Sequence, residues 1–136
     1  VYDDPADLFV AKFLGTPPIN VFSAHVTGEW LCIGNEPVLH VPGLTDREVV
    51  AAIRPEGFVL SEAGKLTCKL NRVEVMGRDV SVVSSHENCE NTDIRSIIST
   101  ENPVDTTKET VRFDIKPTKV FLFDDKTHER LHFDVR

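Results

Sequence analysis

Two groups of neighbouring residues in this 136-residue chain have types that could support chemistry. Ser84 and Ser85 precede His86, a pairing that nucleophilic hydrolases use, and Cys89 lies three residues beyond His86, a spacing seen in metal sites. Two ligands without a second pair do not make a four-ligand zinc site, and a catalytic triad is assembled from residues distant in sequence. We therefore expect neither metal binding nor catalysis from this stretch.

The glycines do not form a phosphate-binding motif. Gly64-Lys65 has Val59 where a P-loop has its first glycine and Leu66 where it has a hydroxyl residue. The other glycines do not match a dinucleotide-binding fingerprint. We expect no nucleotide or other cofactor within these residues.

A charged pair beside a proline marks the middle of the chain. Pro55 fixes its own φ, donates no amide hydrogen and biases Arg54 towards an extended backbone, so a strand over 49–53 should end in a rigid corner. Residues two apart in an extended chain point the same way, so Arg54 and Glu56 should emerge on one face. We interpret them as an ion pair that pins one loop to another; contact with a ligand is the alternative.

Composition limits the classes of partner. The net charge of −7, from 15 basic and 22 acidic residues, repels nucleic acid and anionic lipid surfaces. No apolar run approaches the roughly 20 residues needed to span a bilayer. Cys32, Cys68 and Cys89 are odd in number and lack CxxC spacing, so we expect no disulfide framework and a reducing compartment. The absence of an initiator methionine leads us to expect part of a longer protein.

The first residues have a helical pattern. Asp3 or Asp4 can cap a helix with a proline in its first turn, and Gly15 and Pro17 would end it. Its apolar stripe consists of Leu8, Phe9, Phe13 and Leu14.

From Asn20 the apolar period becomes twofold. Runs at 21–26, 30–33 and 38–41, separated by glycine and proline, predict a meander of short antiparallel strands. Thr45 and Glu48 have capping-box spacing and predict one helical turn before a strand over 49–53. A short strand over 58–60 follows the corner.

The second half predicts a curved sheet. Apolar residues occupy even positions from 66 to 70 and odd positions at 73 and 75, so a β-bulge should lie near Asn71 or Arg72. Such bends favour a small closed barrel. Further strands are expected over 80–83, 94–99 and 111–115, followed by a two-sided central strand over 120–123 and its hairpin partner over 131–135. We expect Phe113, Phe121 and Phe123 in the core, and at an interface only if the sheet face that they occupy lies open.

Three stretches resemble a known family in the same order. Ile53-Arg54-Pro55-Glu56 resembles the signature of the transport-associated OB region of ATPase subunits in maltose and glycerol-3-phosphate ABC importers. Residues 2–20 (YDDPADLFVAKFLGTPPIN) are similar to the end of the nucleotide-binding domain of those subunits, and 120–124 with Thr127 agree near the end. Gly77 matches the tip of a strand pair, although Met76 stands where leucine is expected.

The resemblance implies a division of the chain. Residues 1–19 would be the terminal helix and linker of the nucleotide-binding domain, and residues 20–136 a regulatory domain. The implied fold is mainly β, with OB-like small barrels of short antiparallel strands after a short N-terminal helix. The implied motif residues are Arg54, Pro55, Glu56, Gly77 and Asp124, and the implied residues of the junction with the ATPase domain are Phe9, Phe13, Gly15, Pro17 and Asn20.

The resemblance also implies a function and partners. The chain would be the regulatory and dimerisation domain of an importer ATPase, without catalysis of its own, while ATP and Mg bind the missing N-terminal domain. Its partners would be a second copy, membrane-embedded permease subunits reached through the parent, and in some members a regulatory protein. The complex would lie in the cytoplasm at the inner face of the membrane, without direct insertion.

A second reading comes from the barrel alone. OB-type barrels can hold oligosaccharides or oxyanions, and Trp30 with Arg54 could supply a stacking plane and an anion partner. Few aromatic residues and the acidic net charge weigh against this small-ligand sensor.

Overall fold

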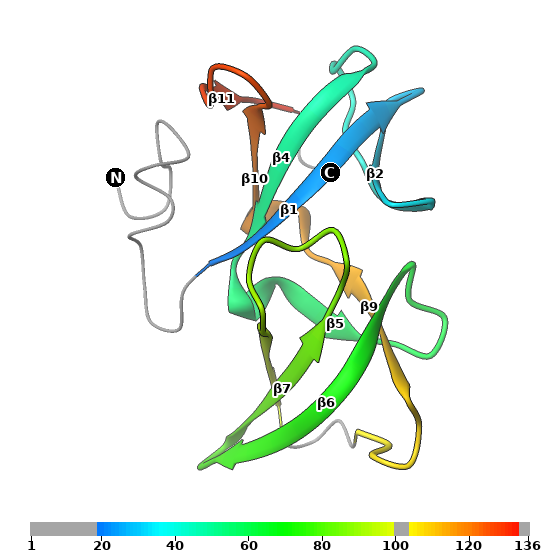
Figure 1. The fold of residues 1–136 in the computed structure, drawn as a ribbon, viewed down its shortest axis with the longest axis vertical. Coiled ribbons are helices and arrows are strands. Elements are labelled where there is room, and N and C mark those ends of the chain that lie inside the picture. The colour runs from blue at the N-terminus through cyan, green and yellow to red at the C-terminus, as the bar shows by residue number, and fades with distance from the viewer. Residues whose placement is uncertain (1–18, 100–103, 134–136) are drawn as a thin grey trace.

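The computed structural model describes residues 19–99 and 104–133, which form two antiparallel sheets lying one above the other in Figure 1. The expected N-terminal helix, with Phe9, Phe13, Gly15 and Pro17, lies outside the described residues. The elements are β1 (Asn20–Thr27), β2 (Trp30–Ile33), β3 (Glu36–His40), β4 (Arg47–Ile53), η1 (Pro55–Gly57), β5 (Phe58–Leu60), β6 (Leu66–Met76), β7 (Asp79–Ser85), β8 (Ile94–Ser99), β9 (Thr110–Ile115), η2 (Pro117–Lys119), β10 (Val120–Asp124) and β11 (Arg130–Leu131). Over these ranges no helix is long and apolar enough to cross a membrane.

The first sheet has six strands in the order β11-β10-β4-β1-β2-β3. Strands β1 to β3 form the meander that the twofold period predicts, which is therefore confirmed. The helical turn expected from Thr45 to Glu48 is wrong, because β4 already begins at Arg47, which pairs with Val26, and Glu48 pairs with His25. Ladder hydrogen bonds of β1 thus prevail over the local capping pattern.

The second sheet has five strands in the order β5-β9-β6-β7-β8. The predicted bulge is confirmed, because the register between β6 and β7 shifts between Leu70 and Arg72 and leaves Asn71 as the extra residue. The sheet curls until β8 contacts β5 and η1. The curled, nearly closed antiparallel sheet confirms the mainly-β, OB-like fold class.

Two apolar clusters cover the two faces of β10, which lies between β4 and β11. Val120 and Leu122 join the main core, which fills the space between the sheets, while Phe121 and Phe123 join a smaller cluster on the other face. The expectation of a two-sided strand is confirmed. Phe113, Phe121 and Phe123 are all core residues, as predicted, with exposures of 0%, 3% and 0%.

Candidate functional site at the junction of the two sheets

The chain crosses between the sheets twice, and both crossings begin with a proline. The first runs from β4 through η1 to β5, and the second from β9 through η2 to β10. The backbone amide of Arg54 donates to the carbonyl of Lys119 at 3.1 Å, and the amide of Lys116 donates to the carbonyl of Gly57 at 2.8 Å. Because each crossing donates to the other, the two turns form one unit.

Gly57 permits this close approach. A Cβ atom at this position would lie 2.8 Å from Cβ of Lys119 and 3.2 Å from Cγ2 of Ile53. The distance of 2.8 Å is shorter than two carbon atoms tolerate, so any side chain here would push the crossings apart.

Of the predicted residues at this unit, Pro55 is buried, whereas the side chains of Arg54 and Glu56 are partly exposed on its outside. Arg54 Nε lies 2.9 Å from Glu56 Oε2, and Lys119 Nζ lies 4.0 Å from the same oxygen. Partial burial raises the pKa of Glu56, but hydrogen bonds from its own backbone and from Arg54, with both positive charges, bring that pKa below its usual range. The carboxylate therefore stays ionised and ties the two crossings together from outside.

Asn20 joins the sheets from inside. Its side chain is buried, with an exposure of 1%. The amide nitrogen donates to the carbonyl of Ile53 at 3.2 Å and to that of Arg95 at 3.1 Å, while the amide oxygen accepts from the backbone nitrogen of Arg95 at 3.1 Å. The Asn20 side chain thus satisfies the backbone N–H and C=O of Arg95 as a neighbouring strand would. It thereby fixes the edge of β8 to the end of β4.

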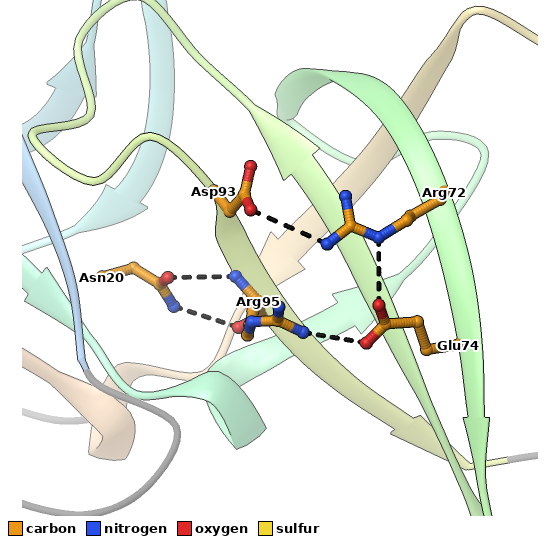
Figure 2. Close-up of polar contacts among 5 residues, drawn as sticks. All are labelled: Asn20, Arg72, Glu74, Asp93 and Arg95. Atoms are coloured by element: carbon orange, nitrogen blue, oxygen red, sulfur yellow. Dashed lines mark hydrogen bonds and ion pairs between the residues drawn. The ribbon is translucent and has the colours of Figure 1, made fainter.

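A chain of charged contacts continues from Arg95 across the outer face of the second sheet (Figure 2). Arg95 Nη1 lies 3.0 Å from Glu74, whose other oxygen accepts from Arg72 Nε at 3.0 Å, and Arg72 also approaches Asp93 at 3.8 Å. Hydrogen bonds from Arg72 and Arg95 lower the pKa of Glu74. Arg72 of β6, Val83 of β7 and Arg95 of β8 lie in one row across the sheet and share its outer face, so the buried Val83 lies between the two arginines.

The stretch with His86 and Cys89 has a local structural role. It runs beside β1, with Ser23 N donating to Asn88 O at 2.8 Å, and Phe22 forming a bridge with Cys89. His86 Nδ1 accepts from the amide of Asn88 at 3.0 Å, and burial raises the pKa of Cys89 to about 11. In the described part of the chain no three histidine, cysteine or acidic residues gather in a way that could hold a metal ion.

Asp124 ends β10, at the end remote from the junction. Its Oδ1 accepts from the amides of Lys126 and Thr127, both at 2.8 Å, and its Oδ2 pairs with the guanidinium of Arg47. The backbone hydrogen bonds, with Arg47 as a further cause, lower the pKa of Asp124 to about 2. The carboxylate shapes the turn before β11 and joins that turn to β4.

Gly77 lies in the turn between β6 and β7. Met76 pairs with Asp79, and Gly77 has a φ of 64°, so the loop has a positive φ at its first central position. This is the conformation that glycine favours in a type II′ hairpin. The predicted residues therefore occupy three separate places: the junction, the end of β10 and the tip of this hairpin.

Trp30 and Arg54, the pair considered for ligand binding, are not brought together. Trp30 pairs with Thr27 at one end of β1, whereas Ile53, next to Arg54, pairs with Asn20 at the other end. The rows are seven steps apart along β1, which at about 3.4 Å per residue places them roughly 24 Å apart. Neither residue lines the hollow of about 150 Å³ beside Leu60 and Arg112 or the open hollow of about 320 Å³ beside Arg47 and Asp124.

The second crossing was missed by sequence reasoning, although it carries a signal. Ile115-Lys116-Pro117 repeats the pattern of Ile53-Arg54-Pro55, an isoleucine and a base before a proline. Both triplets end a strand and start a 3₁₀ turn. Comparing the two would have predicted that they are equivalent crossings.

Comparison with known proteins gives relatives along nearly the whole chain. The chain is 29% identical over 132 residues to the sn-glycerol-3-phosphate import ATP-binding protein UgpC of Ruegeria sp. (strain TM1040), covering 96% of this chain and 37% of that protein. It is 30% identical to the sulfoquinovosyl glycerol transport ATP-binding protein SmoE of Agrobacterium fabrum (strain C58), covering 97% and 38%, and 28% identical to the oligosaccharides import ATP-binding protein MsmX of Bacillus subtilis (strain 168), covering 96% and 39%. No protein-family model matches the chain. The chain thus spans less than two fifths of the length of these relatives.

Proposed function

This chain is homologous to the C-terminal part of the ATP-binding subunits of sugar and glycerol-3-phosphate importers, and on that premise we propose that it is the regulatory and dimerisation domain of such a subunit. The observation that carries the proposal is coverage: similarity runs through 96–100% of this chain but only 37–39% of the relatives. ATP and Mg binding need a P-loop, which this sequence lacks, so we assign them to the remainder of the parent subunit.

In this proposal, residues 1–19 are the terminal helix and linker of the nucleotide-binding domain, and residues 20–136 are the regulatory domain. The parent subunit hydrolyses ATP to drive solute import, in contact with permease subunits at the inner face of the membrane. A body with two interlocked sheets suits a domain that holds two subunits together while their ATPase domains move. Arg54, Pro55, Glu56, Gly77 and Asp124 then have architectural roles, and a regulatory protein is a further partner.

The experiment is the molar mass of this chain by light scattering, from about 10 μM to about 1 mM, where a small interface associates. A dimer that forms with rising concentration supports the proposal. A strict monomer over the whole range contradicts dimerisation through these residues. In parallel, a thermal shift with ATP and Mg should be absent, since a ligand at 100 times its Kd would add about 2.7 kcal/mol of stability.

A further inference from the structure

Strand β6 is longer than the strand that covers one of its sides. It runs from Leu66 to Met76, and β7 pairs with it from Lys69 to the turn. On the other side β9 pairs only with Leu66–Lys69. From Arg72 to Met76, no described residue pairs with this second side, and the hairpin extends beyond the body of the sheet in Figure 1.

The backbone groups of Val73 and Val75 point to this open side. Before the bulge the inward residue Leu70 donates its amide to Glu109 O at 2.9 Å, on the side of β9. Along a β-strand, successive side chains point to opposite faces of the sheet, and successive N–H and C=O pairs point to opposite edges of the strand. Residues whose side chains share a face therefore direct their N–H and C=O groups to the same edge. After the bulge at Asn71, Val73 and Val75 are the residues on the same face of the sheet as Leu70. Their N–H and C=O groups therefore point to the same edge as those of Leu70, the edge that β9 leaves open.

The other edges of the two sheets are short or occupied. The edge of β8 is capped at Arg95 by Asn20, β3 contains Pro37, and β5 and β11 have only three and two residues. At the open edge of β6, by contrast, Val75 has an exposure of 75%, the largest among the large apolar side chains described. An exposed valine beside unpaired backbone groups is suited to pairing with another strand.

We propose that a second copy of this chain pairs with this edge, so that the β6 strands of two copies run antiparallel across a twofold axis, with Val73 opposite Val73. The inference rests on the proposed dimerisation and names its surface. In this register Arg72 of each copy lies opposite Glu74 of the other on the outer face. The arrangement closes on itself, because the same edge of both copies is used and residues 19–99 and 104–133 contain one such edge.

The charges select this register among those in which inward residues face each other. With Val73 opposite Val75, Glu74 would lie opposite Glu74 of the second copy. With Val75 opposite Val75, Arg72 would face the turn that follows Met76, and Glu74 would lie opposite Met76, so no opposite-charge pair would form. Like charges directly opposite across a ladder are destabilising, whereas the proposed register gives two opposite-charge pairs.

The contact is small, which fits its context. Pairing of about five residues per copy buries less than the roughly 1,200 Å² of a stable interface, so association of the isolated chain should be weak. When two parent subunits are already joined by another contact, pairing of their β6 edges is an intramolecular step. A weak interface then forms because its effective concentration is high.

The test is a charge exchange between two variants. Arg72→Glu places glutamates opposite glutamates in a self-pair, and Glu74→Arg places arginines opposite arginines, so each variant alone should dimerise at least about tenfold more weakly than the unmodified chain. A 1:1 mixture restores both opposite-charge pairs and should form the mixed dimer with nearly the original affinity. Native mass spectrometry separates the variants by mass. Mixing does not change the contacts within each variant chain. Recovery of dimerisation in the mixture therefore cannot come from a change in the folding of either variant.

A backbone variant tests the edge itself. Val73→Pro removes an N–H that faces the open side and should abolish dimerisation while the circular dichroism spectrum is kept, whereas Val73→Thr keeps the N–H and should dimerise normally. A dimer of the unmodified chain that survives Val73→Pro and gains nothing in the mixture would overturn this surface and leave the proposed function standing. A strict monomer of the unmodified chain would overturn both.

Discussion

The junction of the sheets and the β6–β7 hairpin are both held by polar contacts, but burial separates them. At the junction the Asn20 side chain has an exposure of 1%, whereas on the hairpin the Arg72 and Glu74 side chains have exposures of 50% and 39%. A buried polar group left without its partner is costly, while an exposed ion pair contributes little. The buried contacts of Asn20 therefore fix the relative position of the sheets, whereas the exposed contacts of the hairpin can exchange with a partner. The Arg54–Glu56 pair on the outside of the junction, with side-chain exposures of 22% and 39%, is closer to the hairpin pair in this respect.

The largest expected effect is that of Asn20→Ala. The substitution leaves the carbonyls of Ile53 and Arg95 and the amide of Arg95 without their side-chain partner. At about 1 kcal/mol or more for each buried group, unfolding free energy should fall by roughly 3 kcal/mol. Urea unfolding followed by circular dichroism measures this. Asn71→Ala at the exposed bulge is the control, with a change within about 0.5 kcal/mol; equal losses at both positions would contradict the contrast between the regions.

Glycine substitutions sharpen the same contrast. Gly57→Ala places a Cβ 2.8 Å from Lys119 Cβ and should cost about 2 kcal/mol by forcing the crossings apart. Gly77→Ala meets nothing within 4 Å but keeps a φ of 64°, so only backbone strain of about 1 kcal/mol is expected. Thermal unfolding of both variants gives the order. A larger loss for Gly77→Ala would mean that the hairpin tip, rather than the crossings, limits stability.

Asp124 tests whether exposed charge contacts in the first sheet behave like those of the hairpin. Its folded pKa of about 2 lies below the unfolded value of about 3.9. Its contribution to stability is therefore complete above the unfolded value and is lost as pH falls through the folded one. Asp124→Asn should destabilise the protein near pH 6, and the difference from the unmodified chain should shrink towards pH 3. Urea midpoints at both pH values measure it; a difference independent of pH would assign the effect to turn geometry.

The sequence predicted what depends on local pattern. The change of apolar residues from even to odd positions around Asn71 located the bulge, and the apolar run over 120–123 predicted a strand buried on both faces. Both features are properties of consecutive residues. The corner at Pro55 was predicted for the same reason.

Long-range partners were beyond local reasoning. The three hydrogen bonds of Asn20 depend on Ile53 and Arg95, which lie 33 and 75 residues away. The false helical turn at Thr45 has the same cause, because the ladder with β1 decides the backbone there. The site residues were expected from resemblance, which names positions but does not say that Arg54, Gly77 and Asp124 lie at three separate places.

The smallest expected effect on stability is that of Glu74→Gln, and it separates folding from association. Glu74 accepts from Arg72 and Arg95 in an exposed position, so the urea midpoint of the monomer at pH 7 should not change measurably. Self-association should still weaken about threefold, because Arg72 of the second copy loses its opposite charge. Glu56→Gln at the junction is the matched control, with association unchanged. If Glu74→Gln instead destabilised the monomer as Asn20→Ala does, the hairpin contacts would be structural in the same sense as the junction, and they could not be exchanged with a partner.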